Sequence, residues 1–193
     1  YTAMKSIFSL DSLGTDFYSS PLFPACFRAA GFYSAMYDNE YLVDDVAFHG
    51  RFILANQRLS EVLFDYRNSE TYTYDGDMVE EITQKRDVPV LYVVHLWGQH
   101  PVYEKRYPEN FKKFVASDYT NTRLTAAQRE IVANYDNATL YNDYVVNEII
   151  KKFEGDDCCL VYFSDHGEEL FENQDYYGHG TAASSLDLRH QIR

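Results

Sequence analysis

Two short apolar runs separated by a long helical pattern constrain the fold of this chain most. Val88–His95 is a near-continuous apolar run rich in β-branched residues, and Cys158–Ser164 is a second run of this kind. Such runs are typical of strands that are buried on both faces of a sheet. Between them, Thr125–Phe153 has apolar residues at helical spacing, with Thr125 as a candidate N-cap and Gly155 as a stop. This order predicts a parallel crossover, so we expect an α/β fold with a largely parallel central sheet flanked by helices.

The remaining chain gives weaker structural signals and no linker. We expect helices at residues 21–31 and 76–85, a strand at residues 32–36, and a mixed helical pattern at residues 52–64. With 193 residues and no repeat or low-complexity segment, residues 1–193 are interpreted as a single domain.

The charge of the chain limits its partners. The formal net charge is −13 and no basic cluster is present, which argues against a nucleic-acid partner. A phosphorylated substrate is still compatible with this charge, because bound divalent cations can invert the sign of the local field.

Three cysteines give no disulfide framework, and cysteine usage leaves the compartment open. Cys158 and Cys159 are expected to be small buried side chains within their apolar run. No apolar run is long enough for a membrane span, and no signal peptide is visible. Because the chain begins at Tyr1 rather than at a methionine, we expect it to be part of a longer protein.

Polar residues follow both expected strands. The first run ends in His95, and the second is followed by Asp165 and His166. Since ligands of open parallel sheets bind beyond the carboxyl ends of the strands, we expect these side chains to converge on one place. Gly167 permits the sharp turn that would let Asp165 and His166 reach one ion. The alternative is an ordinary pair in which Asp165 caps a helix and His166 is exposed.

Four of the six histidines fall in segments expected at this sheet edge, namely His95, His100, His166 and His179. His100 lies in a turn-rich loop, and His179 stands between two glycines that allow close approach to an ion. Imidazole nitrogen and carboxylate oxygen are ligands that zinc prefers. A single histidine is more often an ordinary structural residue, and that interpretation is kept for His49 and His190.

Phosphoryl or sulfuryl transfer also needs a nucleophile. Thr2 and Ser6 are hydroxyl residues just before an apolar stretch. Coordination to a metal would lower the hydroxyl pKa and orient the oxygen for in-line attack. From the residues alone, a helix-capping role explains Thr2 better.

Four ordered motifs resemble those of the lipid A phosphoethanolamine transferases, within the alkaline phosphatase superfamily. The string HLWGQHPVYEKRYP from His95 resembles H-x-x-G-x-H-G-P-x-Y-x-x-R-Y, and Tyr135–Ala138 with Asp143 resembles Y-D-N-x and its aspartate. The string SDHGEELFEN from Ser164 resembles S-D-H-G-E-S-L-G-E-N, and Tyr177–Gly180 resembles Y-L-H-G. Ala30–Phe32 with Asp38-Asn39 fits the weaker N-terminal part, so the resemblance is collinear over nearly the whole chain.

This resemblance implies a sulfatase-like catalytic core with one or two zinc ions. Asp165 and His166 would bind the first zinc together with the nucleophile, which matches Thr2. His100 and His179 would bind or border a second metal and the phosphate, and His95 and Asn39 would contact the substrate. The implied reaction takes phosphoethanolamine from phosphatidylethanolamine onto a threonine and then passes it to lipid A or a glycan. The full-length protein would be anchored in the inner membrane and hold this domain in the periplasm.

The sequence also departs from the family pattern. The glycine of H-G-P is missing after His100, Glu169 and Phe171 replace a serine and a glycine, and one extra residue precedes His179. The family's disulfides are absent, as is an acidic zinc ligand upstream of Thr2. We therefore expect this fragment to bind zinc weakly or not at all unless the missing parts are supplied. Two alternatives remain: a sulfatase or phosphodiesterase hydrolase that uses water as acceptor, and a catalytically inactive binding module.

Overall fold

The computed structural model describes residues 7–8, 21–39, 64–68, 70–82, 86–172 and 175–179. The chain divides into two compact units, of which the first comprises residues 1–73 and 80–96 and the second residues 74–79 and 97–193. Our expectation that residues 1–193 form one domain stays a prediction.

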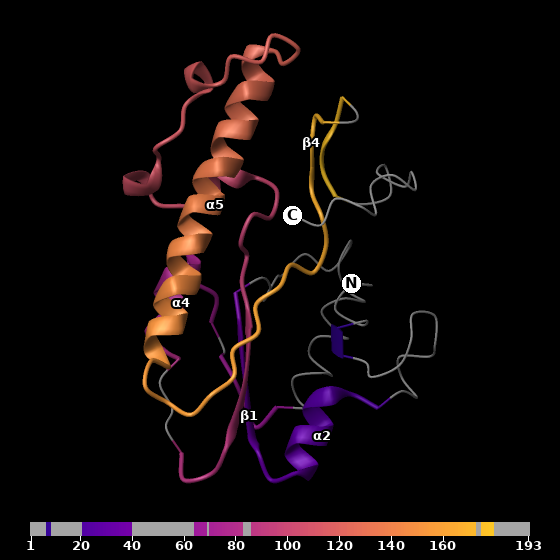
Figure 1. The fold of residues 1–193 in the computed structure, drawn as a ribbon, viewed down its shortest axis with the longest axis vertical. Helices are drawn as coiled ribbons and strands as arrows, with labels where there is room; N and C mark the ends of the chain where they lie inside the picture. The colour runs from indigo at the N-terminus through magenta and orange to yellow at the C-terminus, as the bar shows by residue number, and fades with distance from the viewer. Residues whose placement is uncertain are drawn as a thin grey trace. The chain divides into compact units, whose positions relative to one another are not determined.

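The first unit is built on a parallel three-stranded sheet with the strand order β2–β1–β3 (Figure 1). The strands are β1 (Tyr33–Asp38), β2 (Tyr66–Arg67) and β3 (Val90–His95). Val90, Val93 and Val94 favour extended backbone in β3, because β-branched side chains pack well on a pleated surface. The expected α/β class with a parallel sheet is confirmed, and the strand expected at residues 88–95 forms as β3.

The register of β1 against β3 sets the polar edge of this sheet. Tyr33 lies opposite Val90, and the pairing continues to Asp38 opposite His95. Since the strands are parallel, the last residues of both lie at the same carboxyl edge. The expected strand at residues 32–36 is therefore confirmed as β1, which ends two residues later than predicted.

Helix α2 (Phe23–Ala29) precedes β1 in the first unit, as the sequence predicts. Pro24 lies in the first turn of the helix, where backbone N–H groups have no intrahelical acceptor, so the lack of an N–H in proline costs no hydrogen bond. Gly31 follows the helix with φ at 89°, a left-handed conformation that glycine adopts without strain. Phe23 of this helix stacks on Phe8, which belongs to a small apolar core.

The second unit is organised around α5 (Ala126–Lys152), the long helix that the sequence predicts (Figure 1). Its N-terminus carries a capping box, in which the Thr125 hydroxyl accepts from the Gln128 N–H and the Gln128 side chain accepts from the Thr125 N–H. Lys151 and Lys152 lie in the last turn, where cations interact favourably with the helix dipole.

Shorter elements of the second unit pack beside α5. Helix α4 (Asp75–Val79) is shorter than the helix expected at residues 76–85. Three 3₁₀ turns, η1 (Tyr103–Lys105), η2 (Glu109–Phe111) and η3 (Ala116–Asp118), also contact α5. Strands β4 (Glu169–Leu170) and β5 (Tyr177–Gly178) form an antiparallel hairpin.

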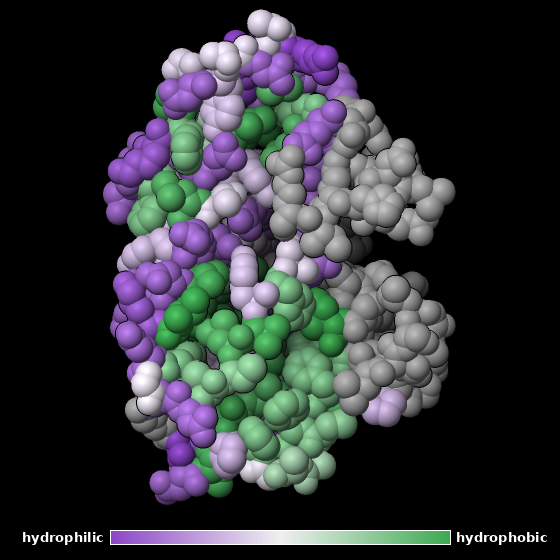
Figure 2. Space-filling model, viewed as in Figure 1, coloured by the Kyte–Doolittle hydropathy of each residue, from purple (hydrophilic) through white to green (hydrophobic). Residues whose placement is uncertain are grey.

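The prediction of a strand at residues 158–164 is wrong, so the expected parallel crossover through the long helix is not formed in the described residues. Residues 158–164 form neither a helix nor a strand, and Val161 is 74% exposed. Cys158 and Cys159 are exposed as well, which corrects the expectation that they are buried. An apolar run forms a strand only where a neighbouring strand pairs with its backbone N–H and C=O groups. The strands that pair in the described sheets are β1, β2 and β3, and β4 and β5, and none of them includes residues 158–164. Figure 2 shows hydrophobic side chains on the surface where this segment runs in Figure 1.

Candidate functional site

Three of the four predicted histidines come together in the second unit. The rings of His100 and His179 have centroids 5.2 Å apart, and those of His166 and His179 have centroids 4.0 Å apart. His100 comes from the loop after β3, His166 from the segment before β4, and His179 follows β5 directly. Segments up to 79 residues apart, from His100 to His179, therefore supply one cluster of imidazoles.

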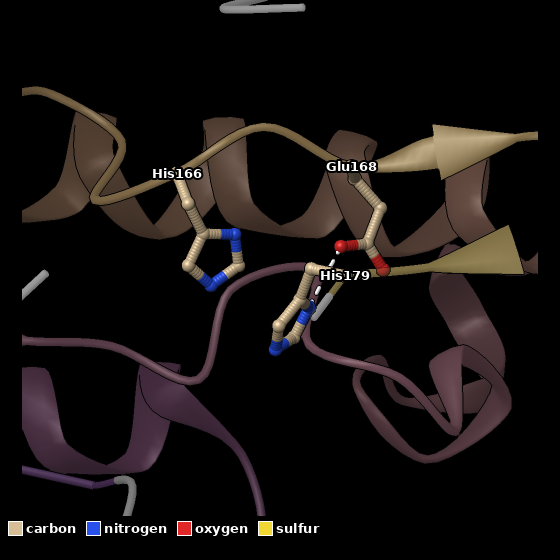
Figure 3. Close-up of side chains that lie close together, drawn as sticks. All are labelled: His166, Glu168 and His179. Carbon is tan, nitrogen blue, oxygen red and sulfur yellow. Dashed lines mark hydrogen bonds and ion pairs between the residues drawn. The ribbon is translucent and has the colours of Figure 1, made fainter. Parts of the chain in front are cut away.

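Glu168 joins this cluster through His179 (Figure 3). Its Oε2 lies 2.8 Å from Nδ1 of His179, and its Oε1 accepts a hydrogen bond from the Tyr103 hydroxyl. Tyr103 is only 2% exposed, and burial together with the neighbouring Glu168 carboxylate raises the pKa of its hydroxyl. The hydroxyl therefore stays protonated and donates to a carboxylate that orients His179. With Nδ1 facing Glu168, Nε2 of His179 is the nitrogen that can face an ion or a substrate.

Asp165 and His166 lie at the outer side of the cluster. The Asp165 Oδ2 is 3.5 Å from the His166 Nε2, and both side chains are more than a third exposed. The other ring nitrogen, Nδ1 of His166, lies 3.0 Å from the carbonyl oxygen of Gly167. Both predicted metal ligands are thus accessible from solvent.

The donor atoms in this region suit a transition metal. One ligand atom each from His166, Glu168 and His179 lies within 4.8 Å of the others. Two imidazoles and a carboxylate are donors that zinc accepts in catalytic sites, which keep a position for water or substrate. The residues present therefore fit zinc. Glu168 is a candidate that the sequence interpretation missed, although the D-H-G-E string contains it.

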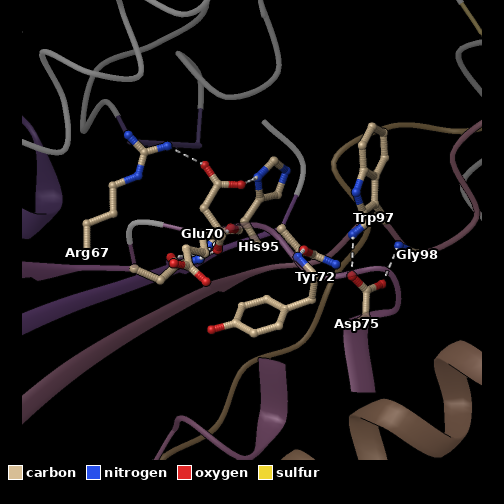
Figure 4. Close-up of polar contacts among 10 residues, drawn as sticks. Arg67, Glu70, Tyr72, Asp75, His95, Trp97 and Gly98 are labelled. Carbon is tan, nitrogen blue, oxygen red and sulfur yellow. Dashed lines mark hydrogen bonds and ion pairs between the residues drawn. The ribbon is translucent and has the colours of Figure 1, made fainter. Parts of the chain in front are cut away.

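His95 belongs to the first unit, at the carboxyl edge of its sheet (Figure 4). Asn39 belongs to the same unit and directly follows β1. His95 Nδ1 lies 3.0 Å from Asp38 Oδ1, and the Arg67 guanidinium donates to Asp38 Oδ2 at 2.8 Å. Asn39 is fully buried, and its Oδ1 accepts a hydrogen bond from the Tyr72 N–H at 2.6 Å. Parallel strand ends thus produce a charged cluster, of which Asp38 and Arg67 had not been predicted as site residues.

Some of the predicted residues lie outside the described ranges, and others border a pocket. Thr2, the predicted nucleophile, and Ser6 lie outside the described residues, as do His49 and His190. A pocket of about 560 Å³ borders His100 and His179 in the second unit, between the first turns of α5 and the β4–β5 hairpin. No helix in the described ranges has the length and hydropathy that a membrane crossing requires.

Comparison with known proteins decides the family. The family model described as Sulfatase matches residues 13–192. The chain belongs to the sulfatase family. Because this match covers nearly the whole sequence, it includes the predicted site segments from His95 to His179.

Relatives of this sulfatase chain are phosphoethanolamine transferases. The phosphoethanolamine transferase EptC of Escherichia coli strain K12 is 40% identical over 112 residues, which are 55% of this chain and 19% of that protein. The phosphoethanolamine transferase EptA of Helicobacter pylori is 32% identical over 127 residues, which are 64% of this chain and 23% of that protein. The chain thus matches only about a fifth of the length of these curated relatives.

Solved structures give the same relationship at the level of the fold. The C-terminal periplasmic domain of Escherichia coli EptC, in complex with Zn, superposes with a TM-score of 0.75 at 28% identity. That match covers 93% of this chain and 54% of the solved domain. The soluble domain of the lipooligosaccharide phosphoethanolamine transferase A of Neisseria meningitidis has a TM-score of 0.63 at 25% identity, covering 98% of this chain and 59% of that domain. The sulfatase-like fold of this chain is therefore shared with phosphoethanolamine transferases.

Proposed function

We propose that this chain is the catalytic part of a phosphoethanolamine transferase that moves phosphoethanolamine from phosphatidylethanolamine to lipid A or to a cell-surface glycan. The observation that carries the proposal is the cluster of His100, His166, Glu168 and His179. Its support is the kinship with proteins named as phosphoethanolamine transferases. We further propose that the chain is part of a longer, membrane-anchored protein and lies in the periplasm, because it matches about a fifth of EptC and its fold matches a domain described as C-terminal and periplasmic.

Zinc is the cofactor that we assign to the proposed site. Asp165 and His166 would hold one ion together with Thr2. His100 and His179 would border a second and keep a ring nitrogen for proton transfer. Zinc supplies a Lewis acid that stabilises charge on the phosphoryl oxygens. The donor atoms of His166, Glu168 and His179, which lie within 4.8 Å of one another, support zinc in the second unit.

The residues of the chain would then carry two transfers. In the first, Thr2 Oγ attacks the phosphorus, its proton passes to His100, and the bond from phosphorus to the diacylglycerol oxygen breaks. His179, oriented by Glu168, gives a proton to that leaving oxygen. In the second, an acceptor oxygen attacks the phospho-threonine and gives its proton to His179, while Thr2 Oγ leaves and recovers a proton from His100. His95 and Asn39 would contact the substrate.

The covalent intermediate provides the decisive test. The whole protein that carries this chain is incubated with phosphatidylethanolamine and without acceptor, and its N-terminal peptide is analysed by mass spectrometry. We expect one phosphoethanolamine group on Thr2, which is lost in Thr2→Ala and kept in the matched control Ser6→Ala. An unmodified Thr2 during measurable turnover would refute the proposed nucleophile.

Metal content tests the zinc assignment separately. Near-stoichiometric zinc is expected in the whole protein by elemental mass spectrometry, with a large loss in His166→Ala and none in His49→Ala. Equal zinc in both variants would remove His166 from the metal site. Full activity in a protein that contains no zinc would refute zinc as the cofactor of the proposed transferase.

A hydrolase is the second candidate, and the match to the Sulfatase model favours it. Such an enzyme would use the same residues with water as acceptor. Release of free ethanolamine phosphate or cleavage of a sulfate ester, without acceptor modification, would identify the hydrolase. Neither activity and no modified threonine would leave a catalytically inactive binding module.

A further inference from the structure

The loop Trp97–Pro101 carries His100, and one of its ends is held by a buried carboxylate. Asp75, at the start of α4, is 5% exposed. Its Oδ1 accepts a hydrogen bond from the Trp97 N–H at 3.0 Å, and its Oδ2 accepts one from the Gly98 N–H at 2.9 Å (Figure 4). Both carboxylate oxygens thus bind consecutive backbone amides, and hydrogen bonds to a charged group are stronger than neutral ones.

The other end of the loop is held by a guanidinium. Arg106 donates from Nε to the His100 carbonyl at 3.1 Å and from a terminal nitrogen to the Pro101 carbonyl at 3.0 Å. Its guanidinium carbon also lies 3.8 Å from the centroid of the Trp97 ring. Arg106 therefore fixes the backbone of His100 and covers the side chain of Trp97, as the planar, multiply donating guanidinium allows.

Each end of the loop contacts a side chain of the charge that suits its backbone groups. The carboxylate takes the N–H groups at the start of the loop, and the guanidinium takes the C=O groups at its end. The ring of Trp97 packs edge-on against the ring of His100, with centroids 5.1 Å apart. Helix α4 is itself tied to α5, because the Gly76 N–H donates to the Tyr141 hydroxyl at 3.1 Å.

We propose that Asp75 and Arg106 are positioning residues, which clamp the Trp97–Pro101 loop and thereby aim the His100 side chain at the reacting phosphoryl group. The catalytic part of this inference rests on the proposed function of His100. A small misplacement of a catalytic group lowers the rate strongly, and loss of an orienting partner commonly lowers activity about 10- to 100-fold.

The test compares Asp75→Asn with Asp77→Asn. Asp77 lies on the same short helix but is exposed, and its carboxylate accepts from the Tyr74 N–H. Asparagine at position 75 keeps the shape but offers one acceptor oxygen in place of two, so one of the two backbone amides loses its acceptor. We expect kcat of the whole protein to fall about 10- to 100-fold in Asp75→Asn with little change in KM, and to stay at the wild-type value in Asp77→Asn.

A second readout does not depend on activity. Trp97 is the single tryptophan of the 193-residue chain, so its fluorescence reports on the clamp directly. Acrylamide quenching of Trp97 in this chain should increase in Asp75→Asn and in Arg106→Gln, but not in Asp77→Asn. Far-UV circular dichroism and thermal melts establish that each variant is folded, and Arg106→Gln serves in place of Asp75→Asn if the latter does not fold.

The outcomes separate this inference from the proposed function. Wild-type kcat in folded Asp75→Asn and Arg106→Gln, with unchanged quenching, overturns the clamp and leaves the transferase standing. Increased quenching in a protein whose wild type has no transferase activity supports the clamp as a structural device and overturns the proposed function. A parallel loss of kcat in Asp77→Asn shows a general effect of α4 and also overturns the specific role of Asp75.

Discussion

The contact between Gly76 of α4 and Tyr141 of α5 leads to a quantitative prediction about stability. The Gly76 N–H donates to the Tyr141 hydroxyl at 3.1 Å, and Tyr141 is buried. A Cβ on Gly76 would overlap the hydroxyl oxygen, whereas the next nearest atom, the Tyr141 Cζ, would lie at 3.3 Å. The hydroxyl is thus both the hydrogen-bond partner of Gly76 and the obstacle to any side chain there.

The single substitutions should each destabilise the chain. Gly76→Ala gains about 0.5–1 kcal/mol of helix propensity. It also displaces the hydroxyl, which costs about 1–3 kcal/mol for the lost hydrogen bond and about 1–3 kcal/mol for overpacking. The free energy of unfolding should therefore fall by about 1–5 kcal/mol. Tyr141→Phe keeps the ring and loses the hydrogen bond only, so a decrease of about 1–3 kcal/mol is expected.

The double variant should have a higher free energy of unfolding than the sum of the two single effects predicts. Once Tyr141→Phe has removed the hydroxyl oxygen, the new Cβ at position 76 meets a ring carbon at 3.3 Å, and the hydrogen bond is lost once rather than twice. We expect the double variant to exceed the additive value by about 2–4 kcal/mol, from the hydrogen bond that is counted once and from part of the overpacking. This is well above the scatter of roughly 0.3–0.5 kcal/mol between independent sites.

Urea unfolding followed by far-UV circular dichroism measures this coupling. The slope of the free energy against urea must stay constant across the four proteins, so that the midpoints report stability alone. Tyr144→Phe, an exposed tyrosine one turn along α5, is the matched control and should combine additively with Gly76→Ala. Additive effects for Gly76→Ala and Tyr141→Phe would refute the contact between α4 and α5 as described.

Three further predictions concern other parts of the chain. Burial alone would raise the pKa of Asp65, but hydrogen bonds from Ser34 and the charge of Arg28 lower it overall. Ionised Asp65 therefore stabilises the fold at pH values above the pKa of the unfolded chain, near 3.8, and this stabilisation is lost as the pH falls through the lower pKa of the folded chain. Urea titrations at neutral and acid pH should show a smaller acid-induced loss of stability in Asp65→Asn than in the wild type. Val102 is exposed with φ at 69°, and Val102→Gly should raise the thermal midpoint, with a gain of about 0.5–1 kcal/mol; a lower midpoint would contradict backbone strain there. Val161→Lys should change the free energy of unfolding by less than about 0.5 kcal/mol, since the side chain is exposed; a cost of several kcal/mol would instead indicate a buried strand.

Local sequence signals predicted the elements that local interactions determine. The helix expected at Thr125–Phe153 begins and ends within a residue of α5, because its capping box and apolar spacing lie within the segment itself. The strand β3 was equally visible, since its β-branched run favours extended backbone whatever its neighbours are. These are cases in which a pattern and a tertiary environment agree.

The failures occurred where pairing between distant segments decides the structure. The run at Cys158–Ser164 has the same pattern as β3 but lies exposed, because apolar composition does not specify a ladder partner. The histidine cluster was foreseen in part: His100, His166 and His179 come together, while His95 pairs with Asp38 in the first unit. Asp75 gave no sequence signal of its own. Tyr103 and Arg106 stand in the motif that begins at His95, but the motif did not indicate their orienting contacts, since their partners are backbone groups or a carboxylate 5 to 65 residues away.

The path of the chain through its two units has a consequence for dissecting the molecule. Helix α4 belongs to the second unit but lies between segments of the first, so the chain passes from one unit to the other after residues 73, 79 and 96. No single cut of the polypeptide separates them. A truncation that starts at Trp97 would retain α5 and the three clustered histidines yet remove Asp75, leaving two amides of the His100 loop without their acceptor. The segments of the two units alternate along the chain, so a continuous stretch that contains the whole of one unit also contains part of the other.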